Sequence, residues 1–125
     1  MRLSVDLDQP DLVKLIFRNV FRMVFGEHGS MILEFHLRKI LARDPYDVLY
    51  ENPKLFCEGL QSFFGNGVKG LLKVMARELI REYGLRDLDP DTLIRLLQKG
   101  DERSKAILFN ILRSSYASRR WSMWR

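Results

Sequence analysis

The apolar residues of this chain recur with the spacing of amphipathic helices. From Leu12 to Val24 they fall three or four positions apart, and the same spacing returns in later stretches. A period of about 3.6 residues predicts helices. We expect helices over residues 10–25, 30–42, 53–64, 68–83, 90–99 and 101–113, with a short helix or turn at 45–50. Near the start, Leu3, Val5 and Leu7 alternate with polar residues, which predicts a short strand or an extended arm.

Residues with known capping preferences mark the predicted helix ends. Three helices should open at an Asp or Asn followed by proline, at Asp44-Pro45, Asn52-Pro53 and Asp89-Pro90. Gly84 and Gly100 should end two others, and the loops are short enough for neighbouring helices to pack antiparallel. The predicted fold is one all-α domain over residues 1–113, a compact bundle of five to six helices. A basic, aromatic C-terminal tail covers residues 114–125.

Residues 17–41 and 56–80 resemble each other at an offset of 39 positions. Each copy is an apolar stretch, a Phe-Gly break and a second apolar stretch. The identical pairs are Phe17/Phe56, Phe25/Phe64, Gly26/Gly65, Leu33/Leu72 and Arg38/Arg77. Stacked repeat arrays need at least three copies, so two copies should face each other as a pseudo-twofold bundle capped by the last two helices. The alternative is that two helix–Gly–helix hairpins resemble each other by composition alone.

In the first copy, the helix over residues 30–42 should bury its apolar positions. They are Ile32, Leu33, Phe35, Leu37, Ile40 and Leu41, and Glu34, Arg38 and Lys39 should be exposed. His36 aligns with Met75 of the second copy, so we expect it at the margin of the core.

The Phe-Gly turns and the His-Leu-Arg-Lys run resemble a group of small archaeal all-helical proteins of unknown function. They are also distantly similar to helical output domains of archaeal signalling proteins. The residues that carry this resemblance are Phe25, Gly26, Gly29, His36, Leu37, Phe64, Gly65 and Gly67. The resemblance implies an all-helical, non-catalytic domain without a known ligand, and it supplies no site residues.

The composition is that of an ordinary globular chain. Of the 125 residues, 46% are hydrophobic and 30% are charged, which suffices for one packed core. The longest apolar run, residues 106–109, is far shorter than the roughly 20 residues of a membrane helix. A signal peptide's apolar core is not seen near the start, and one cysteine, Cys57, allows no internal disulfide. We therefore expect a cytoplasmic protein.

The net charge of +5 is unevenly distributed, because four basic residues and no acid follow Leu112. The body is nearly neutral and the tail is cationic. Within the body, Lys69, Lys73, Arg77 and Arg81 have i, i+4 spacing and should form one stripe along a helix. In the tail, rings alternate with guanidinium groups at Tyr116, Arg119, Arg120, Trp121, Trp124 and Arg125.

Both features are compatible with nucleic acid, through phosphate contacts and base stacking. The commoner explanation of such a stripe is a solvated face paired with acids of other helices, and we favour it. Trp and Arg in the tail also suit an anionic membrane surface or a protein interface. Alternatively, the tail could fold back onto the bundle or mediate an oligomer contact.

No catalytic constellation is recognisable. Gly65-x-Gly67-x-x-Gly70 matches a dinucleotide-binding fingerprint, but a helix is predicted before it where that motif needs a strand, which favours a helix–helix turn. The two histidines and Cys57 form no metal-binding or nucleophilic pattern. We expect no enzyme, no cofactor and no metal. A pocket between the hairpins, lined by Phe25, His36, Cys57 and Phe64, is a further candidate site.

The aromatic content gives the leading functional prediction. Eight Phe, four Tyr and two Trp exceed what a domain of this size should bury. We expect a non-enzymatic interaction or regulatory domain that binds itself or another protein. The alternative is a nucleic-acid-binding protein that uses the tail and the Lys69–Arg81 stripe.

Overall fold

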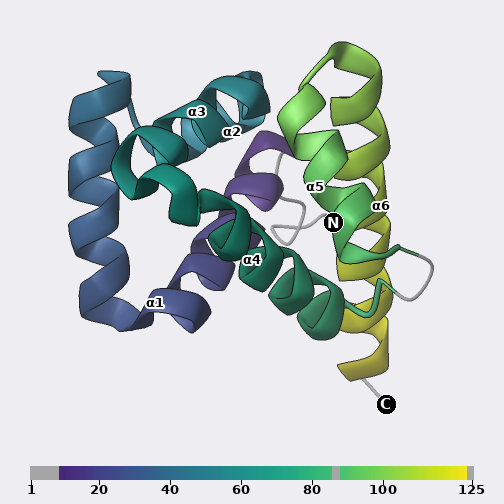
Figure 1. The fold of residues 1–125 in the computed structure, drawn as a ribbon. Coiled ribbons are helices and arrows are strands. Elements are labelled where there is room, and N and C mark those ends of the chain that lie inside the picture. The colour runs from purple at the N-terminus through teal and green to yellow at the C-terminus, as the bar shows by residue number, and fades with distance from the viewer. Residues whose placement is uncertain (1–8, 86–87, 124–125) are drawn as a thin grey trace.

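The computed structural model describes residues 9–85 and 88–123, so the predicted N-terminal strand or arm lies outside the described part. The helices are α1 (Gln9–Leu41), α2 (Pro45–Glu51), α3 (Pro53–Phe64), α4 (Val68–Tyr83), α5 (Pro90–Lys99) and α6 (Glu102–Met123). A 3₁₀ turn, η1 (Gly65–Gly67), joins α3 to α4. The predicted all-α bundle is confirmed (Figure 1).

Helix α1 is broken at Gly26, where φ is 77° and ψ is 171°. Residues 9–25 and 27–41 therefore form two helical segments that diverge at an angle (Figure 1). Gly65, at the equivalent position of the second copy, also has a positive φ, of 62°. Both Phe-Gly turns use a backbone conformation that glycine adopts without steric cost. The predicted helix–turn–helix unit is confirmed in each copy.

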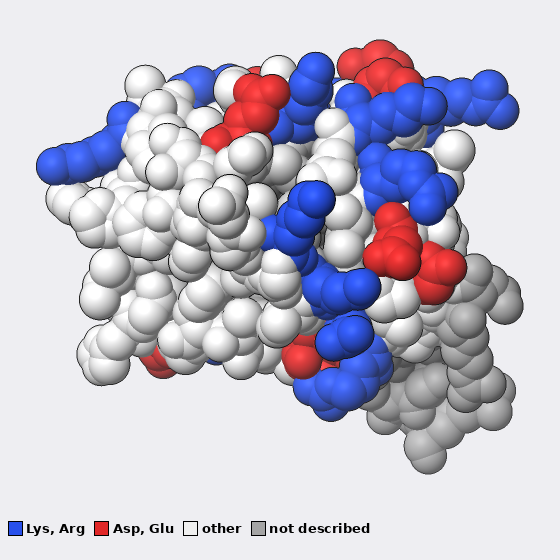
Figure 2. Space-filling model, viewed as in Figure 1, with Lys and Arg blue, Asp and Glu red and all other residues white. Residues whose placement is uncertain are grey.

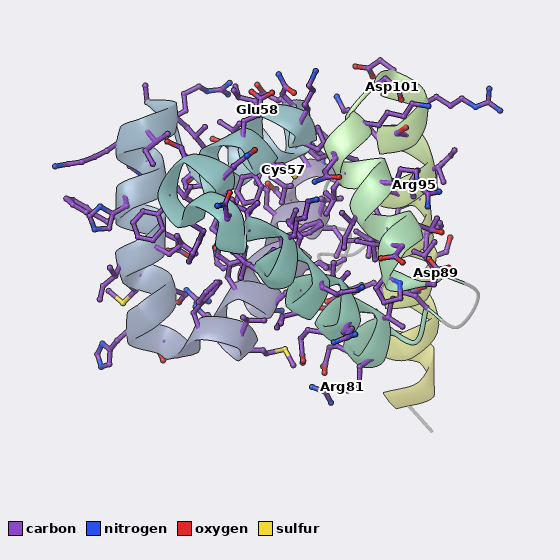
Figure 3. The ribbon with its side chains drawn as sticks, in the orientation of Figure 1. Cys57, Glu58, Arg81, Asp89, Arg95 and Asp101 are labelled. Atoms are coloured by element: carbon purple, nitrogen blue, oxygen red, sulfur yellow. The ribbon has the colours of Figure 1, made fainter. Side chains whose placement is uncertain are left out.

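Side-chain caps begin four helices at the expected residues. The carboxylates of Asp89 and Asp101 accept backbone N–H bonds from Thr92 and Ser104, each at 2.7 Å, at the starts of α5 and α6 (Figure 3). These bonds hold the pKa of both carboxyl groups below the ordinary value. Their stabilisation is therefore present above that value and is lost as pH falls through the lowered pKa. Asp44 and Asn52 cap α2 and α3 in the same way.

The core lies where the two helix–Gly–helix hairpins meet. The ring of Phe21 contacts those of Phe25, Tyr46 and Phe56, with centroids 5.6 to 5.9 Å apart. The rings of Phe25 and Phe64, which are equivalent in the two copies, stack with centroids 6.1 Å apart. The hairpins thus touch at their own Phe-Gly breaks. Such a contact is expected if the two copies face each other.

The last two helices lie on one side of the bundle. The ring of Phe109 in α6 stacks on that of Tyr50 in α2, with centroids 5.1 Å apart. The ring centroid of Tyr116, also in α6, lies 6.5 Å from that of Tyr83 at the end of α4. In Figure 1, α5 and α6 stand at the right and the second segment of α1 at the left. The two copies are therefore covered unequally.

The predicted end of the last helix near Arg113 is wrong, because α6 continues to Met123. No glycine or proline follows Gly100 to stop it. Leu112 is fully buried, and Tyr116 extends the packed side of α6 by a further turn.

Two glycine-to-alanine substitutions distinguish the effect of backbone strain on stability from the effect of helix propensity. In Gly100→Ala a Cβ would lie 2.8 Å from the backbone nitrogen of Lys54, and φ is +61°. We expect a loss of at least about 1–2 kcal/mol of unfolding free energy. Gly70→Ala adds a methyl group to an exposed helical position with nothing within 4 Å, so it should gain roughly 0.5–1 kcal/mol.

Urea unfolding followed by circular dichroism would measure both variants. Equal effects of the two substitutions would contradict the close approach at Gly100.

Candidate interaction surfaces

The second segment of α1 carries an unusually apolar surface. Its large apolar side chains Met31, Ile32, Phe35 and Ile40, together with Phe63 of α3, are between 43% and 59% exposed. With His36, these residues are called the exposed apolar face. A shallow groove of about 590 Å³ lies along this segment. It is lined by Met31, Ile32, Phe35 and His36 and by the charged residues Glu34 and Arg38. Figure 2 shows this side of the molecule, at the left, as mostly uncharged.

The exposure arises because this segment is apolar on two sides. Leu33 and Leu37 point into the core and are 3% and 0% exposed. Ile32, His36 and Ile40 follow an adjacent line with i, i+4 spacing. A helix that is apolar on most sides is normally buried on them. Only one side is covered by the described residues, so the predicted burial of Ile32, Phe35 and Ile40 is wrong.

His36 is also exposed, which corrects the expectation that it lies at the core margin. Its ring stacks on Phe63 at 5.3 Å and meets Phe35 edge-on at 5.6 Å. Lys39 places its Nζ atom 4.9 Å from the centroid of the Phe35 ring. The equivalent residue of the second copy, Met75, is only 2% exposed. The physical reason is the unequal cover, since α5 and α6 pack against α4.

The cationic stripe on α4 consists of Lys69, Lys73, Arg77 and Arg81, all of them exposed. Figure 2 shows basic side chains gathered along α4 in the centre of the view. Lys73 forms an ion pair of 3.6 Å with Asp91 of α5, and Arg81 pairs with Glu78 of its own helix. Lys69 and Arg77 have no ion pair within the described ranges. Two of the four stripe residues are therefore paired with acids, and two are not.

A groove of about 310 Å³ runs between α4 and α5 beside one end of the stripe. It is lined by Lys69, Gly70, Leu72, Lys73, Asp91, Ile94 and Gln98. Two lysines and one carboxylate surround it, so its charge is mixed with a cationic excess.

The described part of the basic tail, residues 114–123, belongs to α6. Residues 119–121 lie on its last turns, and their side chains, like the whole of Trp124, fall outside what the structure describes. The contact of Tyr116 with Tyr83 brings this half of α6 to the C-terminal end of α4.

The four residues of the predicted pocket are not all brought together. Phe25 and Phe64 stack on each other, whereas His36 lies on the outer surface. Cys57 is 7% exposed and lies among the helices (Figure 3). None of the other three lines the groove that contains His36.

Two ionisable side chains of the described interior, Cys57 and Tyr46, have raised pKa values. Burial raises the pKa of the Cys57 thiol to about 12, with a smaller contribution from the charge of Glu58. Tyr46 is buried and donates its hydroxyl hydrogen to Glu34 Oε2 at 2.6 Å, and burial followed by this bond raises its pKa. Within residues 9–85 and 88–123, no group of three His, Cys, Asp or Glu could hold a metal ion. Over the same ranges, no helix has the length and apolar character needed to cross a membrane.

Comparisons with family models, curated proteins and solved structures found no match to this chain. The resemblance to archaeal helical proteins stays a prediction. The surfaces described above are therefore the basis for inferring function.

The raised pKa of Cys57 predicts an unreactive thiol. With a pKa near 12, only about one thiol in ten thousand is ionised at about pH 8, against roughly a tenth or more in the unfolded chain. Labelling by a chromogenic disulfide should be at least about 100-fold slower in the native protein than in urea.

The control is Gln61→Cys, which places a thiol on the exposed side of the same helix and should react at once. Rapid native labelling of Cys57 itself would show that the site opens. Since the folded state favours the protonated thiol, its stabilisation is complete below the ordinary pKa and declines as pH rises from there toward 12.

Proposed function

We propose that the protein is a non-enzymatic interaction domain that binds a second copy of itself through the exposed apolar face. The observation that supports this proposal is the set of five large apolar side chains, each more than two fifths exposed, that adjoin on α1 and α3. Monomeric proteins rarely expose contiguous apolar patches larger than a few hundred Å².

The size of the face suits a small dimer contact. Half-exposed large side chains of roughly 200 Å² each amount to on the order of 500 Å² of surface on one copy. Pairing two copies would bury on the order of 1,000 Å², about the minimum for a specific interface. The contact would also cover the apolar side that the described residues leave open.

The order of residues on the face favours a second copy as the partner. Ile32 and Ile40 lie four positions on either side of His36. If two such helices pack antiparallel about a twofold axis at His36, Ile32 of each copy meets Ile40 of the other. Self-complementary contacts of this kind define the commonest dimers. Lys39 of the two copies would then lie on opposite sides of the axis, about 9 Å apart along the helices, which limits their repulsion.

A buried charge should break this dimer. In Ile32→Asp, symmetry places two unpaired carboxylates in the interface, so we expect the dimer Kd to rise at least about 100-fold. Sedimentation equilibrium over micromolar concentrations would measure it, with circular dichroism to verify folding. The matched control is Val74→Asp, which changes a 48% exposed residue at the position equivalent to Phe35 and should leave the Kd within about threefold.

The position of the axis can be tested by cross-linking. Oxidation of His36→Cys should give a disulfide-linked dimer, whereas Val74→Cys should not. A protein that stays monomeric at every concentration, or a dimer that tolerates Ile32→Asp, would refute the proposal.

A further inference from the structure

The two copies share a backbone design but differ in the charge of their second helix. Of the four stripe positions on α4, only Arg77 recurs in the first copy. The residues found there are Ser30, Glu34, Arg38 and Ala42. Both segments fold as helices after a glycine break, so the fold does not require a cationic stripe. Like charges at i, i+4 spacing are mildly destabilising, and the stripe therefore needs another explanation.

Two basic residues of α1 have partners within the bundle. Lys14 of α1 forms a 2.6 Å ion pair with Asp47, and Arg18 lies over the ring of Tyr46 at 4.9 Å. On α4, in contrast, Lys69 and Arg77 face solvent and pair with no acid of the described chain. Two of the four stripe residues, eight positions apart, therefore offer charge that no acid of the described chain neutralises.

That spacing suits a polyanion with regularly placed charges. Successive cations at i, i+4 lie about 6 Å apart along a helix, so four of them span about 18 Å. One strand of duplex DNA has a phosphate about every 3.4 Å along the axis. Because the strand winds around that axis while the stripe is straight, the stripe is long enough to contact a few neighbouring phosphates of one strand.

The second half of α6 begins beside the end of this surface. No acid follows Glu102, while the bases after it include Arg113, Arg119 and Arg120. The ring contact between Tyr116 and Tyr83 brings this acid-free stretch of helix beside the end of α4. Arg81 projects from that same end, away from the body (Figure 3).

From this juxtaposition we infer that the cationic stripe of α4, with the acid-free half of α6 beside its end, binds the phosphodiester backbone of nucleic acid. The surface differs from the exposed apolar face, because Figure 2 shows the two on separate parts of the molecule. A membrane surface fits less well, since a peripheral helix needs apolar side chains to insert. On α4, Val74 is the one large apolar residue that is markedly exposed.

The inference is tested by fluorescence anisotropy with labelled single-stranded DNA, duplex DNA and duplex RNA over a series of salt concentrations. Lys69→Gln combined with Arg77→Gln removes the two unpaired cations. Affinity should fall at least about tenfold, and the slope of log K against log salt should become shallower by about 1.4 to 1.8. The best-bound of the three probes identifies the form of nucleic acid.

The control removes the same charge from the first copy, by Arg22→Gln combined with Arg38→Gln, both exposed in the structure. Arg38 is the counterpart of Arg77, and this variant should keep the affinity within about threefold, apart from a small general charge effect. Arg119→Gln combined with Arg120→Gln tests the α6 part of the surface and should also weaken binding.

Three results would overturn the inference. They are no binding of any probe at low salt, equal losses in the stripe and control variants, and equally tight binding of polyglutamate or phosphatidylserine vesicles. The same comparisons can be repeated in the Ile32→Asp background, which leaves the stripe intact, so the dimer and the nucleic-acid surface can fail separately.

Discussion

The backbone conformation at Gly26 and Gly65 is the constraint on which the rest of this structure depends. At a positive φ the chain leaves the helix and changes direction, and each break converts one long apolar stretch into a hairpin. The reversal brings Phe25 onto Phe64 and surrounds Phe21 with aromatic rings from α1, α2 and α3. Had α1 continued straight through Gly26, its second segment would have left the bundle, and Leu33 and Leu37 would have lost their burial.

Because other helices cover the second helix of each hairpin to different extents, the two hairpins present different surfaces. Helix α5 packs on α3 and α4 of the second hairpin, and α6 packs on both α4 and α1. Met75 and Leu79 of α4 are buried, and its outer surface is charged. The equivalent residues of the first hairpin, His36 and Ile40, have no such cover and are exposed. One architectural unit thus presents an apolar surface in its first copy and a cationic surface in its second. The proposed dimer and the inferred phosphate contacts follow this division.

The two surfaces would also work together. Because the exposed apolar face and the cationic stripe occupy different parts of the molecule, pairing through the first leaves the second open (Figure 2). A dimer would present two stripes to one polyanion, and a second contact made within a complex is favoured by effective concentration. The buried ionisable groups would take no part in this. Cys57 has its pKa raised by burial, and Tyr46 is committed to Glu34 within the bundle.

The sequence by itself determined the helices, because helix ends depend on local interactions. The Asp or Asn caps, the prolines after them and the glycines act within one turn, so the predicted bounds from Pro45 to Gly100 match the structure closely. Where no stop residue exists, in α6, the prediction ended ten residues too early. Tertiary structure alone decided which apolar sides are covered. The spacing of Ile32, Phe35 and Ile40 marks an apolar side, but burial depends on whether a helix from elsewhere in the chain packs over it. Such cover is a non-local property that the spacing of apolar residues does not encode. It is the reason that His36 is exposed while the equivalent Met75 is buried, and that apolar residues with core-like spacing form a surface.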